Sequence, residues 1–227
     1  MPRKPESRGA CVYCGETFTK RSAMKHLEAC PKRQESLQAA EASNRPVENI
    51  WLLRIQDTYN KDFWLDLEMR GTATLIRLDQ YLRAIWLECC GHLSEFTIGG
   101  WGGDKVAISR KADKIFVPGL TLRHLYDFGT TSETDVRVVG VRSGKATTDH
   151  PIALLARNLQ PEAACQECEQ PAGWLCIECL YEDDKPGFLC DEHVESHPHE
   201  DYGEPLQLVN SPRLGMCGYD GPAEPPY

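Results

Sequence analysis

The apolar positions between residues 49 and 157 change their spacing partway along, which separates predicted strands from a predicted helix. ENIWLLRIQDTY and FWLDLEMRG are rich in aromatic and branched side chains that partly alternate with polar ones, and YNKD between them suits a turn. Because side chains two apart share one face of a strand, the two stretches are predicted to pair as antiparallel strands.

The next segment, TLIRLDQYLRAIWLECC, has the spacing of an amphipathic helix. Thr74 is the expected N-cap and Gly91 the expected end of the helix, and Cys89 and Cys90 are expected to pack that end against the sheet. The apolar face consists of positions three or four apart: Leu75, Leu78, Leu82, Ile85, Trp86 and Cys89.

Further strand-like segments follow the helix at SEFTIGG, KIFVPG, LTLRHLYDFG and TDVRVVGVRSG. The last two are predicted to form a hairpin through Thr130 and Thr131. The pattern therefore predicts an α+β fold in which a central antiparallel sheet combines with one main helix. At DHPIALLARNLQPEA the chain is expected to leave this domain.

Cysteine-rich segments flank the central domain on both sides. The expected organisation is a finger at 1–33, a linker at 34–48, the α+β domain at 49–157 and a cysteine/histidine-rich module at 158–227. PKRQESLQAAEASNRP, which spans most of the linker, is polar and Ala-rich. We expect it to be partly helical and to end at Pro46.

The cysteine spacing indicates bound metal rather than disulfides. The chain has 11 cysteines, but MPRKPESRGACVYC lacks the apolar stretch of a secretory signal, and no window approaches the ~20 apolar residues of a membrane span. We therefore expect a soluble, cytoplasmic protein. In the reducing cytoplasm, Cys-x2-Cys pairs usually hold metal.

Four N-terminal residues have the C-x2-C-x11-H-x3-C spacing of a C2HC zinc finger: Cys11, Cys14, His26 and Cys30. A two-residue gap lets one turn present both thiolates, and a histidine and a cysteine four apart lie on one face of a helix. Phe18 and Met24 are expected to form a small core. Bound zinc is expected to supply most of the folding energy of so small a module.

The C-terminal segment carries eight candidate ligands, enough for two tetrahedral zinc sites. GWLCIEC and GFLCDEH look like a local repeat in which an aromatic–leucine strand leads into a metal-binding turn. With four protein ligands per metal, no coordination position stays open for water, which indicates structural zinc. The ligands are Cys165, Cys168, Cys176, Cys179, Cys190, His193, His197 and His199.

This series of ligands resembles the B-box and related cross-brace zinc modules, in which alternate ligand pairs share a metal. The resemblance implies that one zinc is held by the first and third pairs, and the other by the second and fourth. These sets are Cys165, Cys168, Cys190 and His193, and Cys176, Cys179, His197 and His199. With the finger, three zinc ions are predicted.

Three alternatives stay open for the C-terminal ligands. Cys217 could displace His197 or His199, and HPHED could be a loop whose histidines are incidental. A catalytic zinc held by three of the ligands is the third, although no evident acid/base set accompanies it.

Charge is unevenly distributed, and this bears on partners. The net charge is +4 over residues 1–36, zero over 37–157 and −13 over 158–227. Nucleic acid, if bound, should meet the basic N-terminus, and the acidic end should meet a protein. The finger's candidate phosphate contacts, which could equally be a solvated or protein-binding face, are Lys20, Arg21, Lys25, Lys32 and Arg33.

Two motifs in the central domain resemble the pRiA4b ORF-3-like family of plasmid-borne and insertion-element passenger proteins. Members share a helix that ends before an H-x-x-x-F strand, matched by His92 and Phe96, and a Y-x-Y-D-F-G hairpin, matched by HLYDFG at His124 to Gly129. The likeness covers about residues 49–157, and the cysteine-rich tail also accompanies some members. Some members bear a resolvase-like (TnpR-like) name, but no nucleophile with an arginine cluster is evident here.

Four polar residues of the central domain could form a pocket: His92, His124, Tyr126 and Asp127. The favoured interpretation is structural. Asp127 is expected to bind backbone amides in its turn, His92 to cap the helix end, and His124 to point to solvent.

The expected function is that of a non-enzymatic, zinc-binding adaptor or regulator, bacterial and linked to mobile elements. A protein partner is expected at the acidic module, and nucleic acid or protein at the finger. One alternative is an enzyme with a pocket around His92 and Asp127; another is a sequence-specific DNA-binding regulator.

Overall fold

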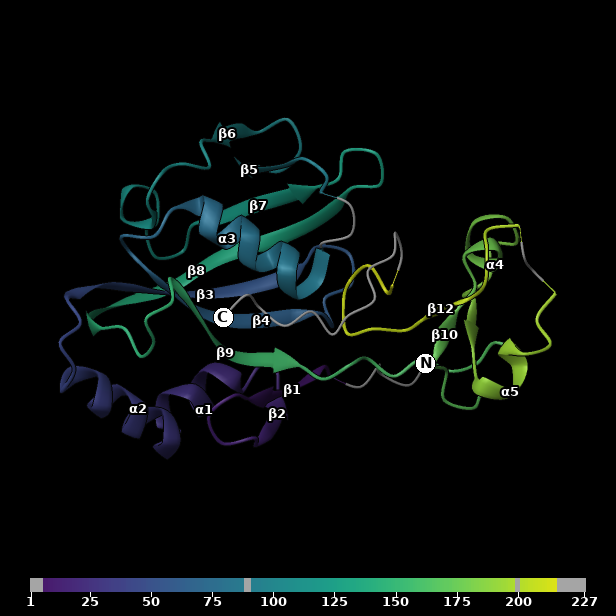
Figure 1. The fold of residues 1–227 in the computed structure, drawn as a ribbon, viewed down its shortest axis with the longest axis horizontal. Coiled ribbons are helices and arrows are strands. Elements are labelled where there is room, and N and C mark those ends of the chain that lie inside the picture. Colours follow the sequence, from purple (N-terminus) through teal and green to yellow (C-terminus); the bar gives the residue numbers. More distant parts are fainter. Residues whose placement is uncertain (1–5, 88–90, 199–200, 216–227) are drawn as a thin grey trace.

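The centre of the molecule is a large antiparallel sheet (Figure 1). The computed structural model describes residues 6–87, 91–198 and 201–215. Within them nine strands pair in the order β2-β1-β9-β4-β3-β8-β7-β5-β6. The strands are β1 (Arg8–Cys11), β2 (Thr17–Thr19), β3 (Val47–Asp57), β4 (Trp64–Arg70), β5 (Ser94–Ile98), β6 (Asp104–Val106), β7 (Thr121–Tyr126), β8 (Ser132–Lys145) and β9 (Ile152–Asn158).

Both predicted strand pairs of the central domain are confirmed. β3 and β4 run antiparallel with Leu53 opposite Leu67. β7 and β8 form the expected hairpin, in which Tyr126 lies opposite Ser132.

The predicted helix is also confirmed, as α3 (Leu75–Leu82), which continues as a π-helical turn over Arg83–Leu87. It begins after Thr74 and lies across one face of the sheet (Figure 1). Its predicted apolar positions are fully buried against the sheet, apart from Cys89, which with Cys90 lies outside the described residues. The buried positions are Leu75, Leu78, Leu82, Ile85 and Trp86.

One predicted strand is wrong. KIFVPG is not a strand: a 3-10 turn at Ala112–Lys114 is followed by irregular chain, in which Phe116 packs against Trp51 with ring centroids 5.8 Å apart. Pro118 and Gly119, which disfavour regular pairing, follow directly. β9, which the sequence analysis did not predict as a strand, pairs between β1 and β4.

The fold combines this sheet with few helices, as predicted in outline, but α3 is not the longest helix. α2 (Pro31–Glu41) is longer, and it lies with α1 (Ala23–Ala29) near the β9 side of the sheet (Figure 1). Two short helices, α4 (Ile177–Tyr181) and α5 (Asp191–Val194), belong to the C-terminal segment. No described helix is long and apolar enough to span a bilayer.

The N-terminal finger is built into the sheet, which the sequence did not indicate. β1 pairs with β9, so that Gly9 lies opposite Asn158. A side chain at Gly9 would come within 2.5 Å of the Trp64 ring, so glycine permits this close approach. Phe18 and Leu27 of the finger pack with Trp64 in one buried cluster. The expected core residue Met24 is partly buried against it.

A buried ion triad fastens α2 to the same side of the sheet. Glu68 of β4 accepts hydrogen bonds from Arg33 at 2.7 Å and from Arg142 of β8 at 2.9 Å. Burial opposes ionisation of Glu68, but the two guanidinium groups hold the pKa of its carboxyl below the usual value. Arg33 is therefore occupied inside the fold rather than offered to phosphate.

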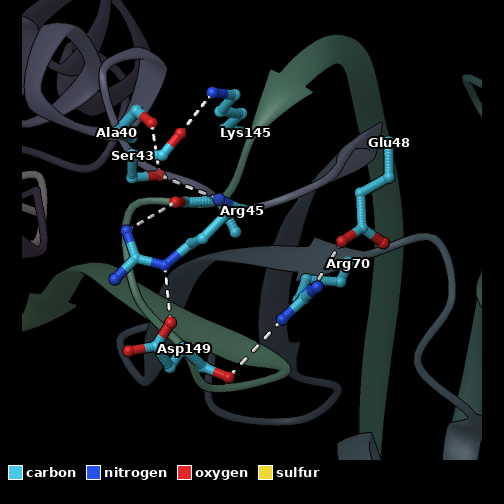
Figure 2. Close-up of polar contacts among 8 residues, drawn as sticks. Ala40, Ser43, Arg45, Glu48, Arg70, Lys145 and Asp149 are labelled. Atoms are coloured by element: carbon cyan, nitrogen blue, oxygen red, sulfur yellow. Dashed lines mark hydrogen bonds and ion pairs between the residues drawn. The ribbon is translucent and has the colours of Figure 1, made fainter.

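The linker is also held in place (Figure 2). Arg45 donates to Asp149 at 2.6 Å, and Lys145 donates to the backbone oxygen of Ser43. Lys145 also donates to the backbone oxygen of Glu41 at 2.8 Å. These contacts bind the end of α2 and the following turn to β8 and to the turn before β9.

The C-terminal segment forms a small sheet beyond the end of β9 and then returns to the central domain (Figure 1). Its strands, in the order β11-β10-β12, are β10 (Trp174–Leu175), β11 (Phe188–Leu189) and β12 (Leu206–Gln207). After β12, Ser211 donates to the Trp86 carbonyl at 2.5 Å, and Arg213 donates to Asp127 at 3.1 Å.

We expect Glu68→Ala to lower the free energy of unfolding by about 3 kcal/mol, because it leaves two partly buried guanidinium groups without their carboxylate. Glu35→Ala is the control, since Glu35 pairs with Lys32 on the surface and its loss should cost about 0.5 kcal/mol or less. Urea denaturation measures both. Equal effects would show that the triad does not stabilise the fold.

Candidate metal centres

The four predicted N-terminal ligands converge at the base of the finger. Cys11 ends β1, Cys14 follows in a turn, His26 lies on α1, and Cys30 lies between α1 and α2. Their ligand atoms all lie within 4.8 Å of one another. The Cys11 and Cys30 sulfurs are 3.9 Å apart, and Cys14 Sγ is 3.4 Å from His26 Nε2.

Local structure explains why these ligands converge. Gly15 has a φ of +74°, and its amide donates to the Cys11 carbonyl at 2.9 Å, which closes the turn between the two thiols. Glu16, the next residue, places a carboxylate oxygen 3.6 Å from His26 Nδ1. That distance is too long for a hydrogen bond, but it places a carboxylate beside the ring nitrogen that does not face Cys14.

The thiols of the finger differ in their environments. Burial raises the pKa of the Cys11 thiol to about 11. Burial also acts on Cys30, but backbone amides at Arg33 and Lys32 lower the pKa of its thiol. Metal must displace the thiol protons, so binding at this site weakens as pH falls.

The first C-terminal cluster joins Cys165, Cys168, Cys190 and His193, whose ligand atoms also lie within 4.8 Å of one another. The Cys168 and Cys190 sulfurs are 3.7 Å apart. His193 Nδ1 lies 3.2 Å from the Cys190 sulfur and 3.8 Å from the Cys165 sulfur. Nδ1 is therefore the nitrogen that faces the centre.

The second C-terminal cluster joins Cys176, Cys179 and His197. His197 Nε2 lies 3.4 Å from the Cys179 sulfur. His199 and Cys217, the two candidates for a fourth ligand, lie outside the described residues. The clusters interleave along the chain in the arrangement that the B-box resemblance implies.

The GWLCIEC and GFLCDEH repeat has matching structure in both copies. β10 leads into Cys176, the N-cap of α4, and β11 leads into Cys190, the N-cap of α5. Trp174 lies opposite Leu189 in the paired strands. Leu175 and Leu189 are buried, whereas Trp174 and Phe188 are only half-buried, so the apolar centre is small.

The distances suit a metal site and exclude disulfides. The eight described cysteines of the three clusters are all free. A disulfide would bring two sulfurs to about 2.05 Å, whereas two thiolates on a tetrahedral zinc with bonds of about 2.3 Å lie about 3.8 Å apart. The three clusters are therefore compatible with zinc and could each hold a metal ion.

The structure brings the polar residues of the central domain into two separate contacts. Asp127 accepts from the amides of Gly129 and Thr130 as expected, and it also binds Arg213. His92 Nε2 lies 3.6 Å from Asp127 Oδ2.

His124 does not point to solvent, contrary to expectation. Its side chain is fully buried, with Nε2 2.9 Å from Asp79 Oδ1, and its ring lies tilted against Phe96 with the centroids 4.7 Å apart. Strand alternation explains the error, because His124 and the core residues Leu122 and Tyr126 share one face of β7.

Sequence reasoning missed one residue, Gln166, that supports the C-terminal clusters. Gln166 donates to the Cys179 sulfur at 3.4 Å, and its side-chain oxygen accepts from the Gly187 amide at 2.9 Å. It thereby links the two interleaved sites. Its position between Cys165 and Cys168 was the only signal, and polar residues commonly occupy such a gap without a role.

Comparisons with known proteins leave the family unassigned. No family model matches the chain, and no curated protein matches it. Among solved structures, a protein of unknown function, MM3350 from Methanosarcina mazei Go1, is similar with a TM-score of 0.41 and 20% identity, over 47% of this chain and 68% of that one.

We expect each cluster to account for one bound metal ion. Cys30→Ser and Cys190→Ser should each lower the metal content by about one ion per chain, because a tetrahedral site with one thiolate removed binds weakly. Cys90→Ser is the control, since Cys90 belongs to no Cys-x2-Cys pair. Elemental analysis of purified protein measures the content, and unchanged content in either cluster variant would contradict the assignment.

We also expect metal removal to act locally. A chelator should make amides of residues 165–197 exchange hydrogen rapidly, because metal replaces an apolar core there. Amides of β3 and β8, which lie over the main core, should stay protected. Hydrogen exchange followed by mass spectrometry measures both regions. Equally faster exchange of amides in β3, β8 and residues 165–197 would contradict a local effect of metal removal.

Proposed function

We propose that this chain is a zinc-stabilised, non-enzymatic binding protein whose C-terminal module recognises a basic segment of a partner protein. Zinc is favoured at the three clusters because thiolate and imidazole donors in a tetrahedral arrangement suit it best. His199 would complete the second C-terminal site. Four protein ligands leave no position for a reacting water, so the metal would be structural.

An acidic aromatic patch on the C-terminal module carries the proposal. Tyr181 and Tyr202 are 54% and 52% exposed, and their ring centroids lie 6.4 Å apart. Glu182 accepts from the Tyr202 hydroxyl at 2.6 Å, and Glu178 accepts from the Asp201 amide at 3.1 Å. We call these five residues the tyrosine patch.

The chemistry of this patch suits cationic side chains. Aromatic faces and carboxylates both attract the ammonium of lysine and the guanidinium of arginine. The net charge of −13 over residues 158–227 would also attract a basic partner from a distance and repel nucleic acid.

The finger is less suited to nucleic acid than its sequence suggested. Arg33 is buried against Glu68, and Lys32 pairs with Glu35 at 3.0 Å. Lys25 is exposed on α1, but so is Glu28 one turn away. We therefore propose that the finger chiefly anchors the N-terminus to the sheet.

The enzyme alternative has less support. Both carboxylate oxygens of Asp127 are occupied, one by turn amides and the other by Arg213. Membership of the pRiA4b ORF-3-like family, a link to mobile elements and a cytoplasmic location stay predictions.

The test selects peptides from a displayed random library on the full zinc-loaded chain. We expect the enriched peptides to be rich in lysine and arginine. The variants Tyr181→Ala and Glu182→Lys should weaken binding of an enriched peptide by about tenfold, since each removes an attraction to its cations.

Matched control variants lie away from the module. Tyr59→Ala removes a tyrosine that is 74% exposed, and Glu35→Lys reverses an exposed charge on α2. Both should leave the affinity unchanged in fluorescence anisotropy. Enrichment of neutral or acidic peptides, or equal losses in control and patch variants, would contradict the proposed function.

A further inference from the structure

A cavity of about 460 Å³ lies where the C-terminal module leaves and rejoins the central domain. Its walls are mainly apolar and include Leu159, Ala163, Phe188, Leu208 and Leu214. We call it the neck cavity. Its volume falls within the range of roughly 300–1,000 Å³ that is usual for ligand sites.

The neck cavity is held open by contacts between the outgoing and returning chain. Asn158 donates to the Asn210 side chain at 2.7 Å, and Asn210 donates back to the Asn158 carbonyl at 2.8 Å. Arg157 donates to the Asn210 backbone at 2.6 Å. The walls are therefore placed before any ligand arrives, which reduces the entropy lost on binding.

The charges around the neck cavity favour a cationic ligand. Three acidic residues, Glu6, Asp62 and Glu162, belong to its lining with one basic residue, Arg8, although Glu6 already pairs with Arg21 at 3.8 Å. The Arg8 guanidinium already donates to Thr17 at 3.0 Å. Glu162 is exposed and forms no ion pair within the described part of the chain.

Backbone groups beside the neck cavity favour a peptide over a small molecule. The amide of Leu159 donates to the Arg8 carbonyl at 2.8 Å, as if continuing the pairing of β9 with β1. The amides of Gln160 and Glu162 donate to no acceptor among the described residues. Exposed donors along an extended segment can pair with an extended peptide.

We propose that the neck cavity receives one apolar side chain of the partner's basic segment. This inference rests on the proposed function and deepens it. The tyrosine patch attracts the cations of the segment, whereas the cavity selects among basic segments those that also carry an apolar residue. Specificity would come from this apolar anchor because charge alone discriminates poorly between basic sequences.

The test compares two synthetic peptides on the full zinc-loaded chain. Both derive from one library-enriched lysine-rich sequence, with phenylalanine at the anchor position in the first and alanine in the second. We expect the phenylalanine peptide to bind about tenfold more tightly, because its ring leaves water on entering the cavity. Isothermal titration calorimetry measures both affinities.

Two variants assign that difference to the neck cavity. Leu159→Asn makes the wall polar at a side chain that is 44% exposed, and Ala163→Phe fills the space. In each variant the affinities of the two peptides should differ by no more than about twofold, and the affinity of the alanine peptide should be unchanged. Leu93→Asn, at a leucine that is 76% exposed and outside the cavity lining, should preserve the tenfold difference.

The outcomes separate the two proposals. Equal binding of both peptides to the unmodified chain, with sensitivity to Glu182→Lys retained, overturns the neck cavity as the anchor site and leaves the proposed function standing. A tenfold difference that survives both Leu159→Asn and Ala163→Phe also overturns it. If neither peptide binds the unmodified chain, both proposals are overturned.

Discussion

The position of β9 between β1 and β4 is the constraint on which the rest of the structure depends. Because β9 is hydrogen-bonded to β1, the two strands of the N-terminal finger, β1 and β2, extend the sheet. Its hydrogen bonds to β4 hold that finger over Trp64, whose ring leaves room only for glycine at position 9. The carbonyl of its last residue, Asn158, accepts a hydrogen bond from Asn210, which lies on the chain that returns from the C-terminal module.

This arrangement joins three parts that have very different apolar content. The central domain buries a large core between α3 and the sheet. The finger borrows part of its core from the sheet, since Leu155 and Ala156 of β9 belong to its cluster. The C-terminal module has only a small buried centre at Leu189 and two of its cysteines, and so depends most on bound metal.

The charged residues at the two ends of the chain also differ in their burial. Arg33, which the sequence offered as a phosphate contact, is neutralised within the fold by Glu68. Carboxylates of the C-terminal module stay at the surface beside exposed tyrosines, where they can meet cations. Arg33 of the basic end is thus used in an internal contact, whereas Arg21 and Lys25 of the same end stay at the surface.

Local patterns were enough to place α3, the β3–β4 and β7–β8 pairs and the ligand groups within the described residues. Each depends on spacing along the chain: a helical face, strand alternation, or paired cysteines two residues apart. The same reasoning failed for His124, and it predicted neither the strand β9 nor the pairing of the finger with the sheet. Whether His124 faces solvent depends on which side of β7 α3 covers, and β9 is a strand because β1 and β4 flank it. Contacts of this kind join residues more than 100 positions apart, such as Gly9 and Asn158, and a one-dimensional pattern carries no information about them.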